Sequence, residues 1–152
     1  MSVLKKIQEL LDSLNIEYEL LNHTPVYTSA DAAKIRDIGI SNGAKALVFI
    51  ADGDPILIVV PGDKKVDLRK FKQQFHIKDL RMASLIEVKE ITTLEVGSIP
   101  PVGKVMNLKS YFDSSFLKKE VVAFNAGSHS VSIRMKASDL IKVENPIIES
   151  FI

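Results

Sequence analysis

The sequence contains no cysteine and no tryptophan among its 152 residues. Without cysteine the chain can form no disulfide framework, no thiolate zinc site, no iron–sulfur cluster and no thiol nucleophile. The three histidines lie far apart and lack the spacing of a zinc-binding motif. The motif G-x-G-x-x-G is also missing, which leaves a dinucleotide site without support. We therefore expect neither a metal nor a cofactor.

Long hydrophobic runs and an excess of one charge are missing as well. The longest apolar runs, at 46–51 and 55–61, fall far short of the ~20 residues that a membrane-spanning helix needs. The 20 Lys and Arg residues nearly balance the 19 Asp and Glu residues, so bulk charge alone cannot hold a nucleic acid. We expect a cytoplasmic protein that binds neither a membrane nor DNA, although a local basic patch is compatible with this balance.

Composition and patterning predict one α+β domain over residues 1–152. The hydrophobic share of 46% and the charged share of 26% are typical of a globular protein, and no repeat or linker divides the chain. Apolar periodicity and capping residues predict helices at 3–14, 29–37, 68–75 and 85–93 and one beginning near 138. Strands are expected at 17–21, 45–51, 56–60, 104–108, 121–125 and 130–135.

Three segments could carry chemistry. Lys45 enters a buried apolar strand, which is unfavourable unless its ammonium reaches water, an acceptor or an anion. The loop GSIPPVG at 97–103 is stiffened by two prolines, and we expect its amides to be unpaired and able to stabilise an oxyanion. The segment 124–130 places small residues and His129 at a bend between two strands, where they could line a pocket. Each segment also has a plain structural alternative. Lys45 could simply reach solvent, the loop 97–103 could be a stiff connection, and His129 could be an ordinary surface histidine.

Taken together, these segments resemble the YbaK/prolyl-tRNA synthetase-associated family, which has the aminoacyl-tRNA editing-domain fold. The resemblance runs in order through HTPVYTSADAA (23–33), GAKALVF (43–49), VVPGDKKVDLRKF (59–71), GSIPPVG (97–103), YFDSSF (111–116) and VVAFNAGSHSVSIRM (121–135). It implies an α+β domain with a mixed, barrel-like sheet and helices packed outside.

For function, the resemblance implies an aminoacyl-tRNA deacylase that acts in trans. Its partner would be the acceptor end of a mischarged tRNA, from which it would hydrolyse a small amino acid such as Ala, Ser or Thr. Substrate positioning, backbone stabilisation of the oxyanion and help from the ribose hydroxyl would replace a side-chain nucleophile. Two alternatives stay open, a non-catalytic module that binds aminoacyl-tRNA or a synthetase, and a hydrolase of other small esters or amides. An aminoacyl-tRNA synthetase as a further partner is also open.

The resemblance also assigns roles to individual residues. It implies that Lys45 holds the terminal adenosine and that Gly97 and Ser98 position the acyl carbonyl as part of the catalytic machinery. It implies a substrate-binding set of Thr28, Ala46, Ile99, Pro100, Gly127, Ser128 and His129. Ala46 stands where relatives carry Asn, so the resemblance does not assign an alanine-specific substrate.

A basic segment offers a surface for tRNA. Seven Lys and Arg residues lie between residues 64 and 81, against only Asp67 and Asp79. We expect part of this segment to contact the acceptor phosphates, with an ordinary solvated face as the alternative. The candidates are Lys64, Lys65, Arg69, Lys70 and Lys72.

Overall fold

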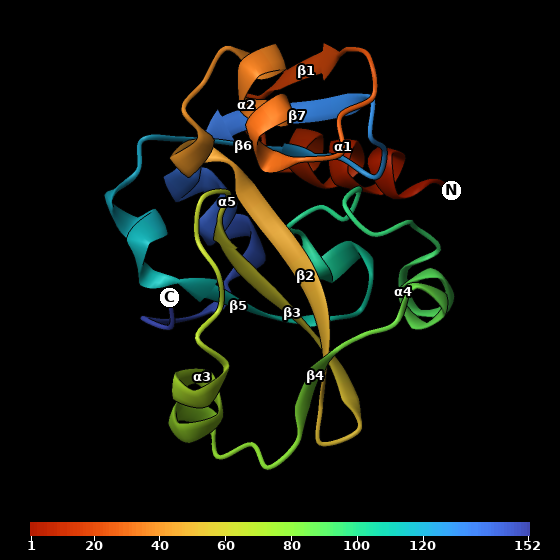
Figure 1. Ribbon diagram of the computed structural model, residues 1–152. Helices are drawn as coiled ribbons and strands as arrows, with labels where there is room; N and C mark the ends of the chain where they lie inside the picture. Colours follow the sequence, from red (N-terminus) through yellow and green to blue (C-terminus); the bar gives the residue numbers. More distant parts are fainter.

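The computed structural model describes residues 1–152, which form two β-sheets with helices around them (Figure 1). The α-helices are α1 (Val3–Ser13), α2 (Ser29–Arg36), α3 (Leu68–Phe75), α4 (Leu85–Thr92) and α5 (Ala137–Glu144), and the 3-10 turns are η1 (Ile40–Asn42), η2 (Gly103–Val105) and η3 (Ser114–Lys118). The strands are β1 (Glu19–Asn22), β2 (Ala44–Ala51), β3 (Asp54–Pro61), β4 (Leu80–Met82), β5 (Lys109–Asp113), β6 (Val121–Asn125), β7 (Val131–Lys136) and β8 (Ile147–Glu149). None of the helices combines the length and apolar character needed to cross a bilayer.

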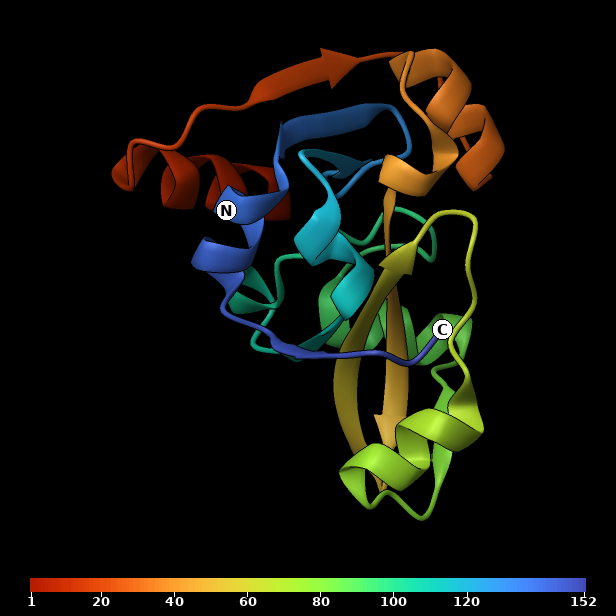
Figure 2. The ribbon, with the colours of Figure 1, turned by 90° about the vertical axis from the view of Figure 1, so that its left-hand side faces the viewer.

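The strands are divided between a mixed sheet and an antiparallel sheet. The larger sheet has the order β4-β2-β3-β5-β8, with β5 parallel to both β3 and β8, and the smaller has the order β1-β7-β6. An isolated bridge between Gly43 and Ala123 joins the two sheets just before β2 begins. Figure 2 shows the smaller sheet and α2 at one end of the molecule and α3 at the other end of the β2–β3 hairpin. The α+β class with a mixed sheet is thus confirmed, and the start of β2 lies where the two sheets meet.

The buried strand β3 supports the fold on both of its faces. Side chains from Ile56 to Val60 are at most 6% exposed, and their continuous apolar character is typical of a strand that is covered on both faces. Leu57 and Val59 belong to the main core, while the alternate residues of β3 join a smaller cluster around Phe71 of α3. Because a rigid strand pair backs it, the start of β2 is a fixed platform for functional side chains.

Local sequence signals set the helix starts, but one predicted strand is wrong. Thr28 and Asp67 accept N-cap hydrogen bonds, and Ser84 forms a capping box with Glu87 at the start of α4. The strand predicted at 104–108 does not form, because the chain turns through η2 and Asn107 adopts a left-handed conformation with φ of 56°. The strand β5 begins only at Lys109. The short strands β4 and β8 were not predicted.

Candidate functional site

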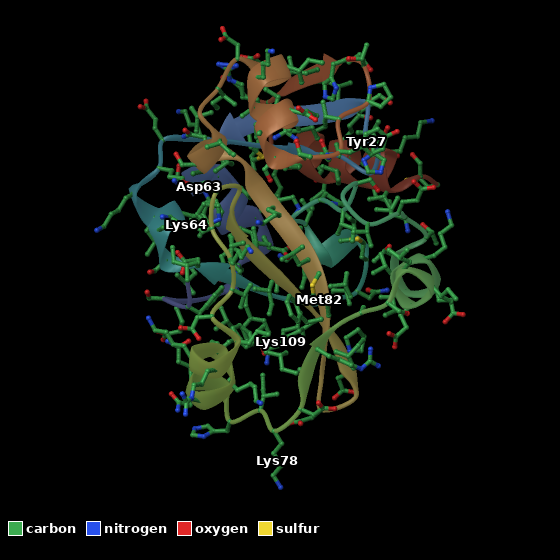
Figure 3. All side chains as sticks on the ribbon, viewed as in Figure 1. Tyr27, Asp63, Lys64, Lys78, Met82 and Lys109 are labelled. Carbon is green, nitrogen blue, oxygen red and sulfur yellow. The ribbon has the colours of Figure 1, made fainter.

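A small cleft opens beside the start of β2, where α2, η1, the loop after β3 and the loop after α4 come together. Its volume is about 220 Å³, and eight of the residues that line it are glycine or alanine. The cationic side chains in its lining are Lys45 and Arg36, and no Asp or Glu lines it. In the view of Figure 3, Tyr27 and Lys64 lie on either side of the start of β2. The cleft is therefore small, has many small residues in its wall and carries positive charge.

Lys45 is held at the cleft by the loop that follows β3. Its Nζ donates a hydrogen bond to the carbonyl of Lys64 at 2.8 Å, and its side chain is half-buried. Burial, and then the charge of Lys65, lower the pKa of Lys45 from the usual 10.5. The loop packs so tightly that a Cβ on Gly62 would lie 2.7 Å from the carbonyl oxygen of Ile40. The ammonium thus reaches an acceptor, as burial of the strand requires, and it also lines the cleft.

The segment Gly97–Ile99 forms another part of the cleft wall. Gly97 and Ile99 line the cleft together with Lys45, and neither of their amides donates a hydrogen bond within the protein. The carbonyl of Ser98 accepts a hydrogen bond from the amide of Gly127 at 2.9 Å. Since N–H and C=O point in opposite directions across a trans peptide, the amide of Ile99 points away from Gly127. Two unpaired amides are therefore available on this segment.

Ser98 differs from the expectation that the loop amides are unpaired. Its amide and its hydroxyl both donate to the carbonyl of Glu95, at 3.1 and 2.8 Å. The residue is only 3% exposed and does not line the cleft. The expectation is wrong for Ser98, because its amide closes a tight turn with Glu95. It is also wrong for Gly103, because its amide donates to Glu144. Ser98 shapes the turn, while its neighbours face the cleft.

The other predicted substrate-binding residues divide into two groups. Thr28 and Ala46 line the cleft, and Thr28 also caps α2 through a 3.0 Å bond from the amide of Asp31. The residues Pro100, Gly127, Ser128 and His129 do not line it. His129 lies behind Gly97, where its Nδ1–H donates to a backbone carbonyl at 3.1 Å and its ring stacks on Tyr27 with centroids 4.7 Å apart. None of these four residues forms the surface of the cleft, while His129 and Gly127 contact the Gly97–Ile99 segment of its wall.

The basic segment extends from the cleft to α3. The residues Lys64, Lys65 and Arg69 are exposed, and Lys70 and Lys72 are half-buried. The segment descends from the end of β3, next to the cleft, to α3 at the opposite end of the molecule (Figure 1). Because the carbonyl of Lys64 holds the Lys45 ammonium, the first basic side chains of the segment begin at the cleft.

Sequence reasoning missed Arg36 and the side chain of Asn125, which also line the cleft. Arg36 is 7% exposed, and it donates from Nη2 to Asn125 Oδ1 at 2.8 Å and from Nε to Ser132 Oγ at 2.9 Å. Asn125 Nδ2 in turn donates to the carbonyl of Gly97 at 2.6 Å. Burial lowers the pKa of Arg36 from 12.5 to about 10, so it is protonated at neutral pH. One feature of the sequence could have indicated Arg36, namely its position one turn after Ala32 on the same face of α2, which is buried.

Glu144 anchors the other end of the Gly97–Gly103 loop. This buried carboxylate accepts hydrogen bonds from the amides of Gly103 at 2.6 Å and Lys104 at 3.2 Å. Burial is the largest influence on it and raises the pKa of Glu144 from the usual 4.5, against the hydrogen bonds that it accepts. A raised pKa in the folded state means that the stability from this group is full below pH 4.5 and is lost as the pH rises through the folded-state pKa.

We expect Glu144→Ala to lower the free energy of unfolding by about 1–3 kcal/mol, because it leaves buried amides unpaired. In Glu144→Gln, which cannot titrate, the deficit relative to the wild type should grow as the pH is lowered from 7 to 5. Urea unfolding at several pH values measures both effects, and Glu149→Gln removes an exposed carboxylate as the control. A deficit of Glu144→Gln that is the same at every pH would contradict the prediction.

Comparison with known proteins agrees with this architecture. Residues 23–143 match the model of the aminoacyl-tRNA editing domain, and the chain belongs to that family. It is 29% identical over 154 residues to the multifunctional Ser/Thr-tRNA deacylase ProXp-y of Escherichia coli (strain K12), covering 97% of this chain and 91% of that protein. It is 27% identical over 140 residues to the prolyl-tRNA editing protein ProX of Acetoanaerobium sticklandii, covering 88% and 85%. The solved structure of the hypothetical protein APE2540 superimposes with a TM-score of 0.87 at 25% identity, covering 96% of this chain and 98% of that one.

Proposed function

We propose that this protein hydrolyses the ester that joins a small, wrongly attached amino acid to the 3′ end of a tRNA. Membership of the editing-domain family and the similarity to a Ser/Thr-tRNA deacylase support this proposal. The observation that carries it is the arrangement of the cleft, where Lys45, Gly97 and Ile99 line one small volume and the amides of Gly97 and Ile99 have no partner within the protein.

The chemistry needs no side-chain nucleophile, because an aminoacyl ester is already activated. Lys45 would hold the phosphate or ribose of the terminal adenosine, and the amides of Gly97 and Ile99 would receive the oxyanion as water attacks the carbonyl carbon. The neighbouring ribose hydroxyl would help to orient that water. Proximity can contribute ~7–11 kcal/mol and one oxyanion donor about 3–4 kcal/mol, which together lie in the range of an enzymatic acceleration.

The dimensions of the cleft favour a small amino acid. Its volume of about 220 Å³ is below the ~300–1,000 Å³ of sites that enclose larger ligands. Glycine and alanine form much of the wall, which suits the side chains of Ser, Thr or Ala. An editing site is needed for such substrates because a synthetase pocket separates amino acids that differ by one methylene by only ~1–3 kcal/mol.

The basic segment would contact the acceptor stem, and salt dependence tests this. We expect the double substitution Arg69→Ala and Lys70→Ala to weaken tRNA binding and to make the plot of log kcat/KM against log salt shallower by ~0.7–0.9 for each phosphate that the variant no longer neutralises. Lys142→Ala, which removes an exposed cation from α5, should leave the slope unchanged. A double variant with the slope of the wild type would exclude α3 from the tRNA interface.

The proposal is tested with purified protein and tRNAs charged with Ser, Thr or Ala, next to the same tRNAs carrying a large cognate amino acid, with no synthetase present. We expect release of at least one small amino acid well above the spontaneous rate and no release of the large one. Binding without hydrolysis of any of them would favour a non-catalytic module. Equal turnover of a free aminoacyl ester and the aminoacyl-tRNA would favour a hydrolase of small esters.

A further inference from the structure

The most unusual group in the cleft is a buried arginine with no acidic partner. Arg36 is 7% exposed, and its side-chain partners, Asn125 and Ser132, are neutral. The only ion pair of an arginine in the structure is the exposed pair of Arg81 and Glu87. A buried charge without a counter-charge destabilises a fold, and an apolar side chain of similar volume would avoid that penalty. Stability therefore does not explain Arg36.

We propose that Arg36 is a positioning residue, which acts through Asn125 to fix the orientation of the Gly97–Ile99 segment in the cleft. This inference rests on the proposed function for its catalytic consequence, while the orientation itself is a property of the free protein. It assigns Arg36 no contact with the reacting atoms.

The guanidinium determines how the Asn125 side chain is oriented. An amide side chain can turn by 180°, which exchanges its oxygen and its nitrogen. Arg36 can only donate hydrogen bonds, so it requires the Asn125 oxygen on its side. The NH2 group of Asn125 then faces the carbonyl of Gly97, to which it donates at 2.6 Å. Without Arg36, this orientation would be held mainly by the Gly97 carbonyl, and any flip of the amide would place oxygen against oxygen and release Gly97.

A second branch of the network keeps Arg36 itself in place. The carbonyl of Thr24 only accepts, so His23 Nδ1 carries a proton and donates to it at 2.8 Å, and His23 Nε2 and the hydroxyl of Ser132 form a second hydrogen bond at 2.8 Å. The Ser132 oxygen also accepts from Arg36 Nε at 2.9 Å. Arg36 can only donate and the carbonyls of Thr24 and Gly97 can only accept, so the directions of the bonds that these groups make are fixed.

The Gly97–Ile99 segment depends on few polar contacts. Glu95, Val96 and Gly97 are exposed, and the segment is tied to β6 and the following turn by the Asn125 bond to Gly97 and the Gly127 bond to the carbonyl of Ser98. Loss of the Asn125 bond would loosen the peptide on one side of Gly97 and misalign the two unpaired amides. A displacement of about 1 Å in such a group can lower a rate by about 100-fold.

Four variants separate this role from a general structural one. Arg36→Met removes the hydrogen-bond donors. Arg36→Lys keeps the charge but lacks the planar group that donates to both Asn125 and Ser132. Asn125→Asp keeps an acceptor for Arg36 but cannot donate to Gly97. Arg81→Met removes a surface arginine as the matched control. We expect kcat to fall about 10–100-fold in the first three variants with KM changed less than about 3-fold, and no change in the control.

Amide hydrogen exchange in the free protein gives an independent readout. We expect the amides of Ser98 and Gly127, whose hydrogen bonds hold the segment in the wild type, to exchange faster in Arg36→Met and Asn125→Asp, with the amides of α5 unchanged. Wild-type kcat and exchange in a folded Asn125→Asp or Arg36→Lys variant would overturn the inference. If the wild type deacylates no tRNA, the proposed function fails, while the exchange rates still decide whether Arg36 orients the segment.

Discussion

Replacement of Lys45 by methionine is expected to lower kcat/KM for deacylation by at least about 100-fold while the protein stays folded. The substitution keeps the apolar stem in the half-buried start of β2 and removes the ammonium from a cleft that contains no acid. The carbonyl of Lys64, which loses its partner, lies in an exposed residue where water can replace the bond. Initial rates with a mischarged tRNA, together with thermal unfolding of both proteins, measure the two parts of this prediction.

The pH dependence of the same residue gives a further check. Burial and Lys65 lower the pKa of Lys45, so its ammonium is lost at a lower pH than that of a free lysine. The part of the rate that depends on Lys45 should therefore decline as the pH rises toward that lowered pKa. Lys45→Arg keeps a charge but brings a larger, planar group to a narrow cleft, and we expect it to restore only part of the activity. Full activity in a folded Lys45→Ala protein would discard the proposed mechanism.

Gly97→Ala is expected to reduce deacylation about 10–100-fold and to destabilise the protein by about 1–3 kcal/mol. Gly97 has a φ of 90°, a conformation that residues with a Cβ rarely adopt. An added Cβ would also lie 3.1 Å from Cε1 of His129, so the ring or the segment must move. Either movement shifts the amide that is proposed to receive the oxyanion. Initial rates and urea unfolding measure the two effects.

Gly53→Ala is the matched control for that substitution. Gly53 has a φ of 88° at the tip of the β2–β3 hairpin, and no atom lies within 4 Å of the position that its Cβ would take. We expect Gly53→Ala to destabilise the fold through the same backbone strain and to leave the rate unchanged. If both variants lose stability and neither loses activity, the Gly97 amide has no part in the reaction.

The fold was predictable where the signals are local. Periodicity and capping residues defined α1 to α5, and the Asp52–Gly53 turn between two apolar runs defined the β2–β3 hairpin. The strand at 104–108 could not be excluded from sequence, because the turn there is held by Glu144, which is 41 residues away from Gly103 along the chain. The strands β4 and β8 have three residues each and exist only through their pairing with longer neighbours.

The site was predictable only in part for the same physical reason. Lys45 and the Gly97–Gly103 loop carry signals that are visible in the sequence, a charge at a buried strand and a pair of prolines between glycines. The role of Arg36 depends on hydrogen bonds to residues 89 and 96 positions away, which no local pattern contains. The pairing of the Ser98 amide depends on how the chain turns after α4, a detail of backbone geometry that residue types do not determine.

The central claim is that the substrate ester lies in the cleft beside Lys45 and the amides of Gly97 and Ile99. The structure of a complex with a substrate analogue tests this claim most directly. The ligand is a serine or threonine joined through an amide to 3′-amino-3′-deoxyadenosine, which cannot be hydrolysed. We predict that its carbonyl oxygen lies within hydrogen-bond distance of the amides of Gly97 and Ile99, with Lys45 Nζ on the adenosine end. A ligand bound elsewhere, or bound in the cleft with its carbonyl turned away from both amides, would contradict it.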